Sequence, residues 1–282
     1  LKKAERTGKL IFVDCYTSWC GPCQTLAKEV FTLDSVADFF NRHFLCVKLD
    51  IEKGKGLELK KPFEIRAYPT LLFLDGKQQV VHRIVGCDGA EYLMKEAGKA
   101  LDPQLNFRAM QERYMAGERA TDFILEYLNY LGHAYLEEEA NAIALQYLQG
   151  FKEEELITSA NWKIIEKYIK DPLAIPLQVV MKRRKAFFDL APEQEVINKL
   201  NLTCRSALLP FTRWGPDSEI VFDERYYDAL VAYFKSVDYD LAPECLANLY
   251  TAGFMYRGDY SGMLEEMKRV MAYGIVNSYM KE

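Results

Sequence analysis

Two cysteines separated by two residues, in the run Trp19-Cys20-Gly21-Pro22-Cys23, constrain the fold of the first part of this chain more than any other feature. The run follows the apolar stretch Leu10–Val13, which is typical of a buried strand. It precedes a segment in which Leu26, Ala27 and Val30 have helical spacing. Cysteines at this spacing either close a small disulfide or supply half of a zinc site. Their position between a strand and a helix indicates a thiol–disulfide exchange site.

The two cysteines are expected to have different roles in such a site. Cys20 stands at the start of the helix, where free backbone N–H groups and the helix dipole favour a thiolate, so it is the expected nucleophile. Cys23 lies one turn into the helix, is expected to be the more buried of the two, and is the expected resolving thiol. We expect Trp19 to shield the pair from water on one side.

Asp14 interrupts the apolar strand six residues before the nucleophile. A carboxylate is costly to bury, and burial raises its pKa. We therefore expect Asp14 to accept the proton of Cys23 during resolution. The alternative is a carboxylate at the end of the strand that faces solvent.

Tyr68-Pro69-Thr70 precedes a second apolar run. Proline at this place either simply begins a strand or follows a cis peptide bond. A cis bond packed against the two sulfurs would leave the backbone of Tyr68 free to pair with an extended substrate peptide.

Zinc is the alternative reading of the cysteine pair. A structural zinc site needs two further cysteine or histidine ligands at suitable spacing, and the sequence has no second pair of that kind. His43, His82 and His133 are scattered. The sequence therefore predicts no metal and no cofactor beyond a redox-active Cys20–Cys23 disulfide.

The pattern of secondary structure changes near residue 102. Strand and helix signals alternate up to Leu101 and predict an α/β fold with two parallel crossovers and a final hairpin. After Asp102-Pro103 only helical patterns follow, and they recur at intervals of very roughly 30 to 40 residues. We predict an α/β domain over 1–101 and an all-α domain over 102–282, for which tetratricopeptide-like helical hairpins are one candidate architecture.

Residues 1 to about 101 resemble the thioredoxin fold. The Cys-Gly-Pro-Cys run matches the family's active site, and Asp14 matches its buried carboxylate. The resemblance implies that Lys48 is the buried lysine that tunes Asp14. It implies a substrate-binding surface from the set Trp19, Tyr68, Pro69, Thr70 and Gly86. Gln24 replaces a basic residue common in the family, which affects the redox potential but not the type of reaction.

The resemblance implies a thiol:disulfide oxidoreductase, a reductase or an isomerase, that acts on client proteins with disulfides. It implies an upstream thiol–disulfide donor or acceptor of electrons, and the helical domain would position the client. The alternative is a binding scaffold in which the helices do the work and the thioredoxin-like domain is a docking module. Tyr16–Trp19 and Lys28–Phe31 are similar to thioredoxin-like domains of bacterial cell-envelope proteins. That similarity implies an extracytoplasmic, periplasmic setting, with the cytoplasm as the alternative.

Charge and hydropathy exclude other classes of function. Residues 1–100 carry 16 Lys and Arg against 13 Asp and Glu, and the remainder carries 20 against 28. Neither part is basic enough to suggest a nucleic-acid partner. No apolar stretch approaches the length of a membrane span. The sequence begins at Leu1 without an initiator Met, so we expect that an N-terminal segment, which can be a signal peptide, is missing.

The chain has seven cysteines, an odd number. Four of them lie well beyond the active-site run, and Cys15 lies shortly before it. We expect Cys46 to be a core residue on a strand. Cys87, beside Gly86, is either a third regulatory thiol or a partly buried bystander. Cys204 and Cys245 stand on predicted helices 41 positions apart, and the spacing alone does not derive a bridge between them. Aromatic residues of the helical part, including Trp162, Phe187, Trp214 and Tyr227, are expected to be mainly core.

Overall fold

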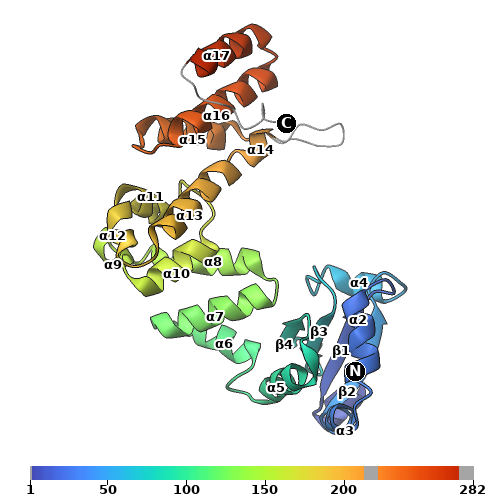
Figure 1. Cartoon of the computed structure of the whole chain (residues 1–282). Coiled ribbons are helices and arrows are strands. Elements are labelled where there is room, and N and C mark those ends of the chain that lie inside the picture. Colours follow the sequence, from blue (N-terminus) through green and yellow to red (C-terminus); the bar gives the residue numbers. More distant parts are fainter. Residues whose placement is uncertain (1, 213–221, 273–282) are drawn as a thin grey trace. The chain divides into compact units, whose positions relative to one another are not determined.

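The computed structural model describes residues 2–212 and 222–272 (Figure 1). It confirms the fold class: a four-stranded α/β sheet comes first and helices follow. The last helix of the α/β part ends at Leu101, as expected, but the chain divides into compact units between Ala140 and Asn141. The first unit therefore includes helices beyond the predicted boundary near residue 102. Whether 1–101 and 102–282 are the functional domains stays a prediction.

The elements of the first unit form around one sheet. Its strands are β1 (Leu10–Tyr16), β2 (Phe44–Asp50), β3 (Thr70–Leu74) and β4 (Val80–Val85). Its helices are α1 (Lys2–Thr7), α2 (Gly21–Thr25), the π-helical η1 (Leu26–Val30), α3 (Asp34–His43), α4 (Gly56–Lys60), α5 (Gly89–Leu101), α6 (Phe107–Met115) and α7 (Thr121–His133). Helix α8 (Glu137–Leu148) begins in this unit and ends in the next.

The order of strands in the sheet is β2-β1-β3-β4. Strands β1 and β2 are parallel, whereas β3 is antiparallel to both β1 and β4. The expectation of two parallel crossovers is therefore wrong for the second one. The physical reason is that β3 begins at the end of the sheet where β2 finishes, so the connection passes β1 without returning to the opposite end, and its helix α4 has only five residues.

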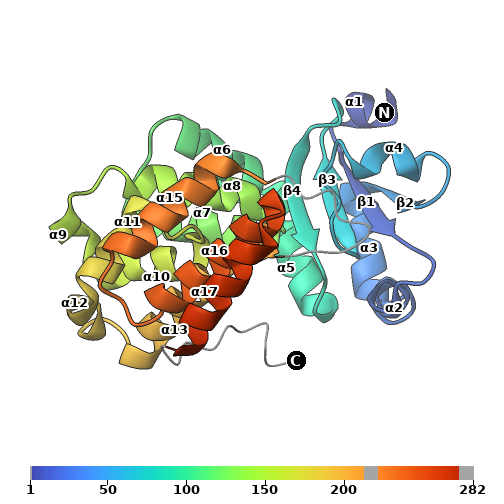
Figure 2. The same cartoon turned by 90° about the horizontal axis from the view of Figure 1, so that it is seen from above.

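Both faces of the sheet are covered, and Figure 2 shows α2, α3 and α5 on one side and α1 and α4 on the other. Phe12 and Phe73 face the first side, where they pack with Phe40, Phe44 and residues of α5. Ile11, Val13 and Cys15 alternate with them and face the second side. These two apolar layers leave β1 buried on both faces, as its run of apolar residues predicts.

Helices α6 and α7 cover the outer edge of β4. The Tyr130 hydroxyl accepts the Arg83 backbone N–H at 2.9 Å and donates to the Arg83 carbonyl at 2.8 Å. The Phe107 N–H donates to Nδ1 of the buried His82 at 3.2 Å, and His82 Nε2 lies 3.1 Å from Glu96 Oε2. Since Nδ1 accepts, Nε2 carries the proton and donates to Glu96. Both backbone groups of Arg83 on the edge of β4 are thus satisfied by the Tyr130 side chain of α7.

The second unit is helical throughout its described residues. Its helices are α9 (Glu153–Leu156), α10 (Ser159–Tyr168), α11 (Ile175–Lys182), α12 (Arg184–Phe188), α13 (Glu193–Ser206), α14 (Leu209–Thr212), α15 (Glu224–Ser236), α16 (Ala242–Arg257) and α17 (Tyr260–Ala272). Trp162, Phe187 and Tyr227 are buried as expected, and Trp214 lies outside the described residues. Across residues 2–212 and 222–272, no helix combines the length and the apolar character that crossing a membrane requires.

Candidate active site

Cys20 and Cys23 are joined by a disulfide at the start of α2, with Cα atoms 5.3 Å apart. Cys20 is the N-cap residue, and its Sγ accepts the Cys23 backbone N–H at 3.1 Å. Pro22 lies within the first turn, where its missing N–H removes no helical hydrogen bond. The expectation that Cys23 is the more buried residue is wrong, because Cys20 and Cys23 are each only 3 % exposed.

The sheet brings the segment around Pro69 to the end of the sheet at which the disulfide follows β1. Cys15 pairs with Thr70 in the register of β1 and β3, so the residues after β1 and those before β3 lie at one end of the sheet. The Tyr68–Pro69 peptide bond is cis. Thr70 is fully buried, and its hydroxyl donates to the Ala67 carbonyl at 2.7 Å.

Gly86, the residue after β4, lies at the same end of the sheet. Its N–H donates to the Pro69 carbonyl at 2.9 Å. Its φ of 74° is a conformation that glycine adopts without the steric cost that a side chain brings. The structure thus connects Gly86 directly to the Pro69 segment with which the resemblance groups it.

Trp19 is an exposed side chain of the site. It is 67 % exposed, so most of its indole ring faces solvent and only part of it can shield the disulfide. Its Nε1–H donates to Glu52 Oε2 at 2.8 Å, and its ring meets the Tyr68 ring edge-on with centroids 5.8 Å apart. Glu52 was not expected in the site, since nothing in the sequence links it to a tryptophan 33 positions earlier.

Asp14 is buried, with 2 % of its surface exposed, and the reading in which it faces solvent is wrong. Burial raises the pKa of its carboxyl to about 6, and the charge of Lys48 opposes that rise. Neither carboxyl oxygen has a hydrogen-bond partner. A carboxyl group with a pKa near neutrality can both accept and release a proton at physiological pH.

Lys48 lies near Asp14, but it is not a buried lysine. Its Nζ lies 3.9 Å from Asp14 Oδ2 and 4.5 Å from the centre of the Tyr16 ring, and its side chain is 49 % exposed. The reason is that Lys48 stands on β2, the edge strand of the sheet. At this distance the pair is a charge interaction without a hydrogen bond.

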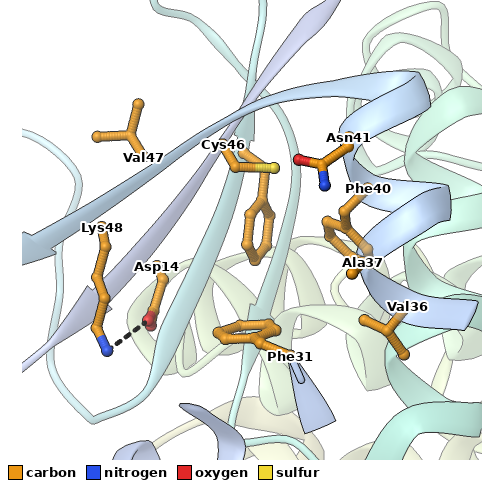
Figure 3. Close-up of a pocket in the computed structure, with 10 residues that line it drawn as sticks. Asp14, Phe31, Val36, Ala37, Phe40, Asn41, Cys46, Val47 and Lys48 are labelled. Carbon is orange, nitrogen blue, oxygen red and sulfur yellow. Dashed lines mark ion pairs between the residues drawn. The ribbon is translucent and has the colours of Figure 1, made fainter. Parts of the chain in front are cut away.

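A pocket of about 260 Å³ opens beside Asp14, between β1, β2, η1 and α3. Figure 3 shows Lys48 reaching toward Asp14, while Cys46 on the same strand points toward α3. The expectation that Cys46 is a core residue is wrong, because it is exposed on the edge strand. The pocket gives the otherwise buried carboxyl group an opening on the β2 side of the sheet.

Cys87 is only half-buried, and its Sγ–H donates to the Gly89 carbonyl at 3.4 Å. Burial raises the pKa of this thiol to about 11, so it is protonated at neutral pH. A protonated thiol is a weak nucleophile, which favours the bystander reading over the regulatory one.

Comparison with known proteins identifies relatives of this chain. A thioredoxin-like family model matches residues 1–76. The thioredoxin of Mycobacterium tuberculosis strain H37Rv is 35% identical over 101 residues, which cover 36% of this chain and 80% of that protein. A protein disulfide-isomerase of Datisca glomerata is 32% identical over 92 residues, 31% of this chain and 18% of the isomerase.

Among solved structures, that of a provisionally named disulphide-isomerase from Bacteroides thetaiotaomicron is 50% identical, with a TM-score of 0.34. It covers 36% of this chain and 84% of its own. The chain therefore spans most of a thioredoxin but less than a fifth of the plant isomerase. Because the match to the mycobacterial thioredoxin includes four fifths of that protein, this chain belongs to the thioredoxin-like family of oxidoreductases.

Proposed function

We propose that this protein is a thiol:disulfide oxidoreductase that reduces or isomerises disulfides of client proteins. The observation that carries the proposal is the Cys20–Cys23 disulfide at the N-terminus of α2, next to a strand that holds the buried carboxyl of Asp14. The disulfide is the oxidised form that a reductase has after one turnover.

In the reduced enzyme, the Cys20 thiolate attacks one sulfur of the client disulfide. A mixed disulfide forms, and the other client sulfur leaves as a thiolate that takes a proton from water. The N-terminus of α2 stabilises the attacking thiolate, because its free N–H groups point at the sulfur. The Cys23 N–H that lies 3.1 Å from Cys20 Sγ is one of these groups.

Resolution is the second step. The Cys23 thiol gives its proton to Asp14, and the resulting thiolate attacks Cys20 Sγ. The second client sulfur leaves as a thiolate that takes a proton from water, and Asp14 returns its proton to solvent. Two electrons have then moved from the enzyme to the client, which holds two thiols. Asp14 suits the role of proton acceptor because its pKa is raised to about 6, and Lys48 tunes it from 3.9 Å.

The client would bind along the edge formed by Trp19, Tyr68, Pro69, Thr70 and Gly86. Trp19 and Tyr68 offer an aromatic pair, and the 67 % exposure of Trp19 leaves a face for an apolar client side chain. The backbone of Tyr68 would pair with an extended client segment. The helical residues after Leu101 would position the client, and an upstream thiol–disulfide protein would restore the reduced form.

The experiment that tests the proposal is insulin reduction with dithiothreitol as the electron source. Wild type is expected to accelerate precipitation of the insulin B chain, and Cys20→Ser is expected to lose all acceleration. Cys23→Ser should instead trap a mixed disulfide that dithiothreitol releases. Equal acceleration by wild type and Cys20→Ser would exclude the proposal.

The scaffold function makes a different prediction in the same variants. If the helices were the working part, a Cys20→Ser/Cys23→Ser variant would retain clients as well as wild type does. Under the oxidoreductase proposal, covalent capture depends on Cys20 and increases in Cys23→Ser. Mass spectrometry of acid-quenched mixtures distinguishes the two, since only the second leaves a disulfide to Cys20.

We also propose an extracytoplasmic, periplasmic location, which rests on the likeness of Tyr16–Trp19 and Lys28–Phe31 to cell-envelope proteins. Fractionation of the source cells with a periplasmic and a cytoplasmic marker tests it. Recovery of the protein with the cytoplasmic marker would contradict this location.

A further inference from the structure

Helix α13 carries a lysine on its buried face. Val196, Leu200 and Cys204 recur every four residues and are buried, which is the pattern of a helix face packed against its neighbours. Lys199 lies on the same face, three residues after Val196, and only 9 % of its surface is exposed. Lysine is almost never buried to this extent unless an anion pairs with it. The position of Lys199 therefore requires a counter-ion.

The described part of the chain does not supply that counter-ion directly. Across residues 2–212 and 222–272, the Lys199 ammonium has no hydrogen-bond partner and no carboxylate within 4.0 Å. Glu195 lies one turn earlier on α13, but its Oε1 accepts the Trp162 indole N–H at 2.8 Å. Glu166 acts on Lys199 only through its charge, at longer range. The charge of Lys199 is thus buried without a direct partner.

A cavity of about 660 Å³ gives an anion access to Lys199. It lies between α10 and α13 and opens to solvent. Three lysines and two glutamates line it, a balance of one positive charge: Lys167, Lys170 and Lys199 against Glu166 and Glu195. An anion that enters this cavity is therefore attracted by its net charge.

The uncharged lining residues indicate what kind of molecule fits. Asn198, Thr203 and Ser206 bring amide and hydroxyl groups to the cavity, which can donate hydrogen bonds to oxygen atoms of an anion. Leu202 also lines it and is 66 % exposed, so it offers an apolar surface. A molecule with an anionic group and an apolar portion would satisfy both parts.

The type of cation favours phosphate as the anionic group. A planar carboxylate is bound most specifically by the fork of an arginine, whereas phosphate is also bound by lysine acting as a compact charge with three N–H donors. The described residues that line the cavity include no arginine. We propose that the cavity between α10 and α13 binds the phosphate group of a small molecule, with the Lys199 ammonium as its counter-ion. This site would function whether or not Cys20 and Cys23 exchange disulfides.

Protonation of Lys199 controls the affinity. Burial lowers its pKa to about 8, the charge of Glu166 opposes this, and Lys170 lowers the pKa further. Lys199 is therefore mostly charged at pH 7, and a bound anion stabilises that charge. As the pH rises through 8, the free protein loses the charge and the affinity should fall. Lys167 and Glu195 are the other ionisable residues that line the cavity.

Titration of the full chain at pH 7 tests the site, with backbone amide NMR of α13 as the readout. The probes are inorganic phosphate and phenyl phosphate, in about 0.15 M NaCl to screen attraction by exposed charges. We expect saturable shifts in α13 with both probes. Tighter binding of phenyl phosphate would identify a phosphate ester as the ligand class, and equal binding would identify free phosphate.

Variants of Lys199 separate this site from general attraction of anions. Lys199→Gln should weaken phosphate binding at least about tenfold, because it removes the buried charge. Lys163→Gln, at an exposed lysine of α10 that does not line the cavity, is the matched control and should stay within about twofold of wild type. Lys199→Met should also lose binding, while its Tm without phosphate rises by roughly 2–4 °C because an unpaired buried charge is gone. Loss of binding in a more stable variant cannot come from unfolding.

A pH series with sulfate gives a second readout, since sulfate keeps its charge throughout the range. Its affinity for wild type should fall by up to about tenfold between pH 7 and pH 9. Lys199→Arg keeps its charge at both pH values and should remove most of that fall.

Two results would overturn the inference. One is the absence of saturable shifts in α13 up to about 10 mM phosphate and phenyl phosphate. The other is equal affinity of wild type, Lys199→Gln and Lys199→Met for these probes.

Discussion

At the scale of single residues, the strongest physical conflict in the structure is Asp14. A carboxyl group that is 2 % exposed and has no hydrogen-bond partner destabilises the folded state whenever it is ionised. Lys48 offsets part of this cost from 3.9 Å, but its own side chain is half exposed, so solvent screens the interaction. A residue kept at such cost is what a proton-transfer role would require.

The Asp14→Asn variant measures this cost through pH. The pKa of Asp14 is raised to about 6 in the folded state, above its value in the unfolded chain. Well below pH 4 both states are protonated and no penalty exists. As the pH rises to 6 and beyond, the unfolded state ionises first, so wild-type stability falls by roughly 3 kcal/mol. Asparagine does not titrate, so the stability of the variant relative to wild type should rise by that amount between about pH 3 and pH 7.

Urea unfolding at a series of pH values gives this difference directly. Any constant cost or benefit of the asparagine cancels, because only the change with pH is used. Asp38→Asn, at an exposed position on α3, is the control. A pH dependence for Asp14→Asn no larger than that of the control would mean that the pKa of Asp14 is not raised.

Removing the charge of Lys48 should raise the pKa of Asp14 further. Lys48→Gln deletes the cation that lowers this pKa, and the half-exposed position of Lys48 keeps the change small because solvent screens its charge. Carbon-detected NMR of the Asp14 carboxyl measures it. Lys53→Gln, which removes the exposed partner of Asp50, should leave the Asp14 titration unchanged. A lower pKa in Lys48→Gln would be the contrary result.

At the scale of elements, one hydroxyl group on α7 makes two hydrogen bonds to the edge of β4. Tyr130 satisfies both the N–H and the carbonyl of Arg83, on the outer edge of the sheet. The Arg83 guanidinium, itself buried, in turn donates to the carbonyls of Phe63 and Glu64 in the connection that leads to Tyr68. Helix α7 is thereby linked through a single residue to the segment before the site.

Tyr130→Phe should therefore destabilise the first unit. The substitution keeps the aromatic contacts with Phe107 and His82 but leaves two backbone groups of Arg83 without partners. We expect a loss of roughly 2 kcal/mol in urea unfolding. Tyr135→Phe, at a half-exposed ring, is the matched control and should change stability by less than about 0.5 kcal/mol. Equal effects in both variants would show that the Tyr130 hydroxyl is not stabilising.

The sequence predicted which segments form the strands and the helix of the site better than it predicted how those strands pair in the sheet. The apolar runs identified β1 and β3, and the Cys-Gly-Pro-Cys run located the start of α2. The direction of β3 was missed, because an apolar run looks the same in a parallel and an antiparallel strand. Cys46 and Lys48 were placed in the interior, but the position of β2 at the edge of the sheet is set by strand order, which no local pattern encodes.

Contacts between distant residues were the least predictable. The pairs Trp19–Glu52 and Arg83–Tyr130 join residues 33 and 47 positions apart. Both depend on the completed fold, and no spacing rule connects them. The ion pair between Arg205 and Glu244 is of the same kind.

At the scale of the whole molecule, the question is where the first folding unit ends. The change from alternating to purely helical patterns predicts an end near residue 102, whereas the compact unit extends to Ala140. Several polar contacts cross residue 102. Arg108 pairs with Asp75 at 2.9 Å, Phe107 donates to His82, and Tyr130 binds Arg83. A chain cut at residue 101 would lose all three and expose the edge of β4 to water.

Two fragments distinguish these boundaries. Residues 1–150 keep α6, α7 and α8 complete, and residues 1–101 keep only the sheet and its own helices. We expect 1–150 to unfold cooperatively and to reduce insulin. We expect 1–101 to have a Tm at least about 10 °C lower, because buried groups such as Nδ1 of His82 lose a hydrogen-bond partner. Tyr130→Phe within 1–150 should lie between the two, since it removes one of the three contacts. If 1–101 were as stable as 1–150, the folding unit would end near residue 102 and the helices on β4 would be an accessory to it rather than part of it.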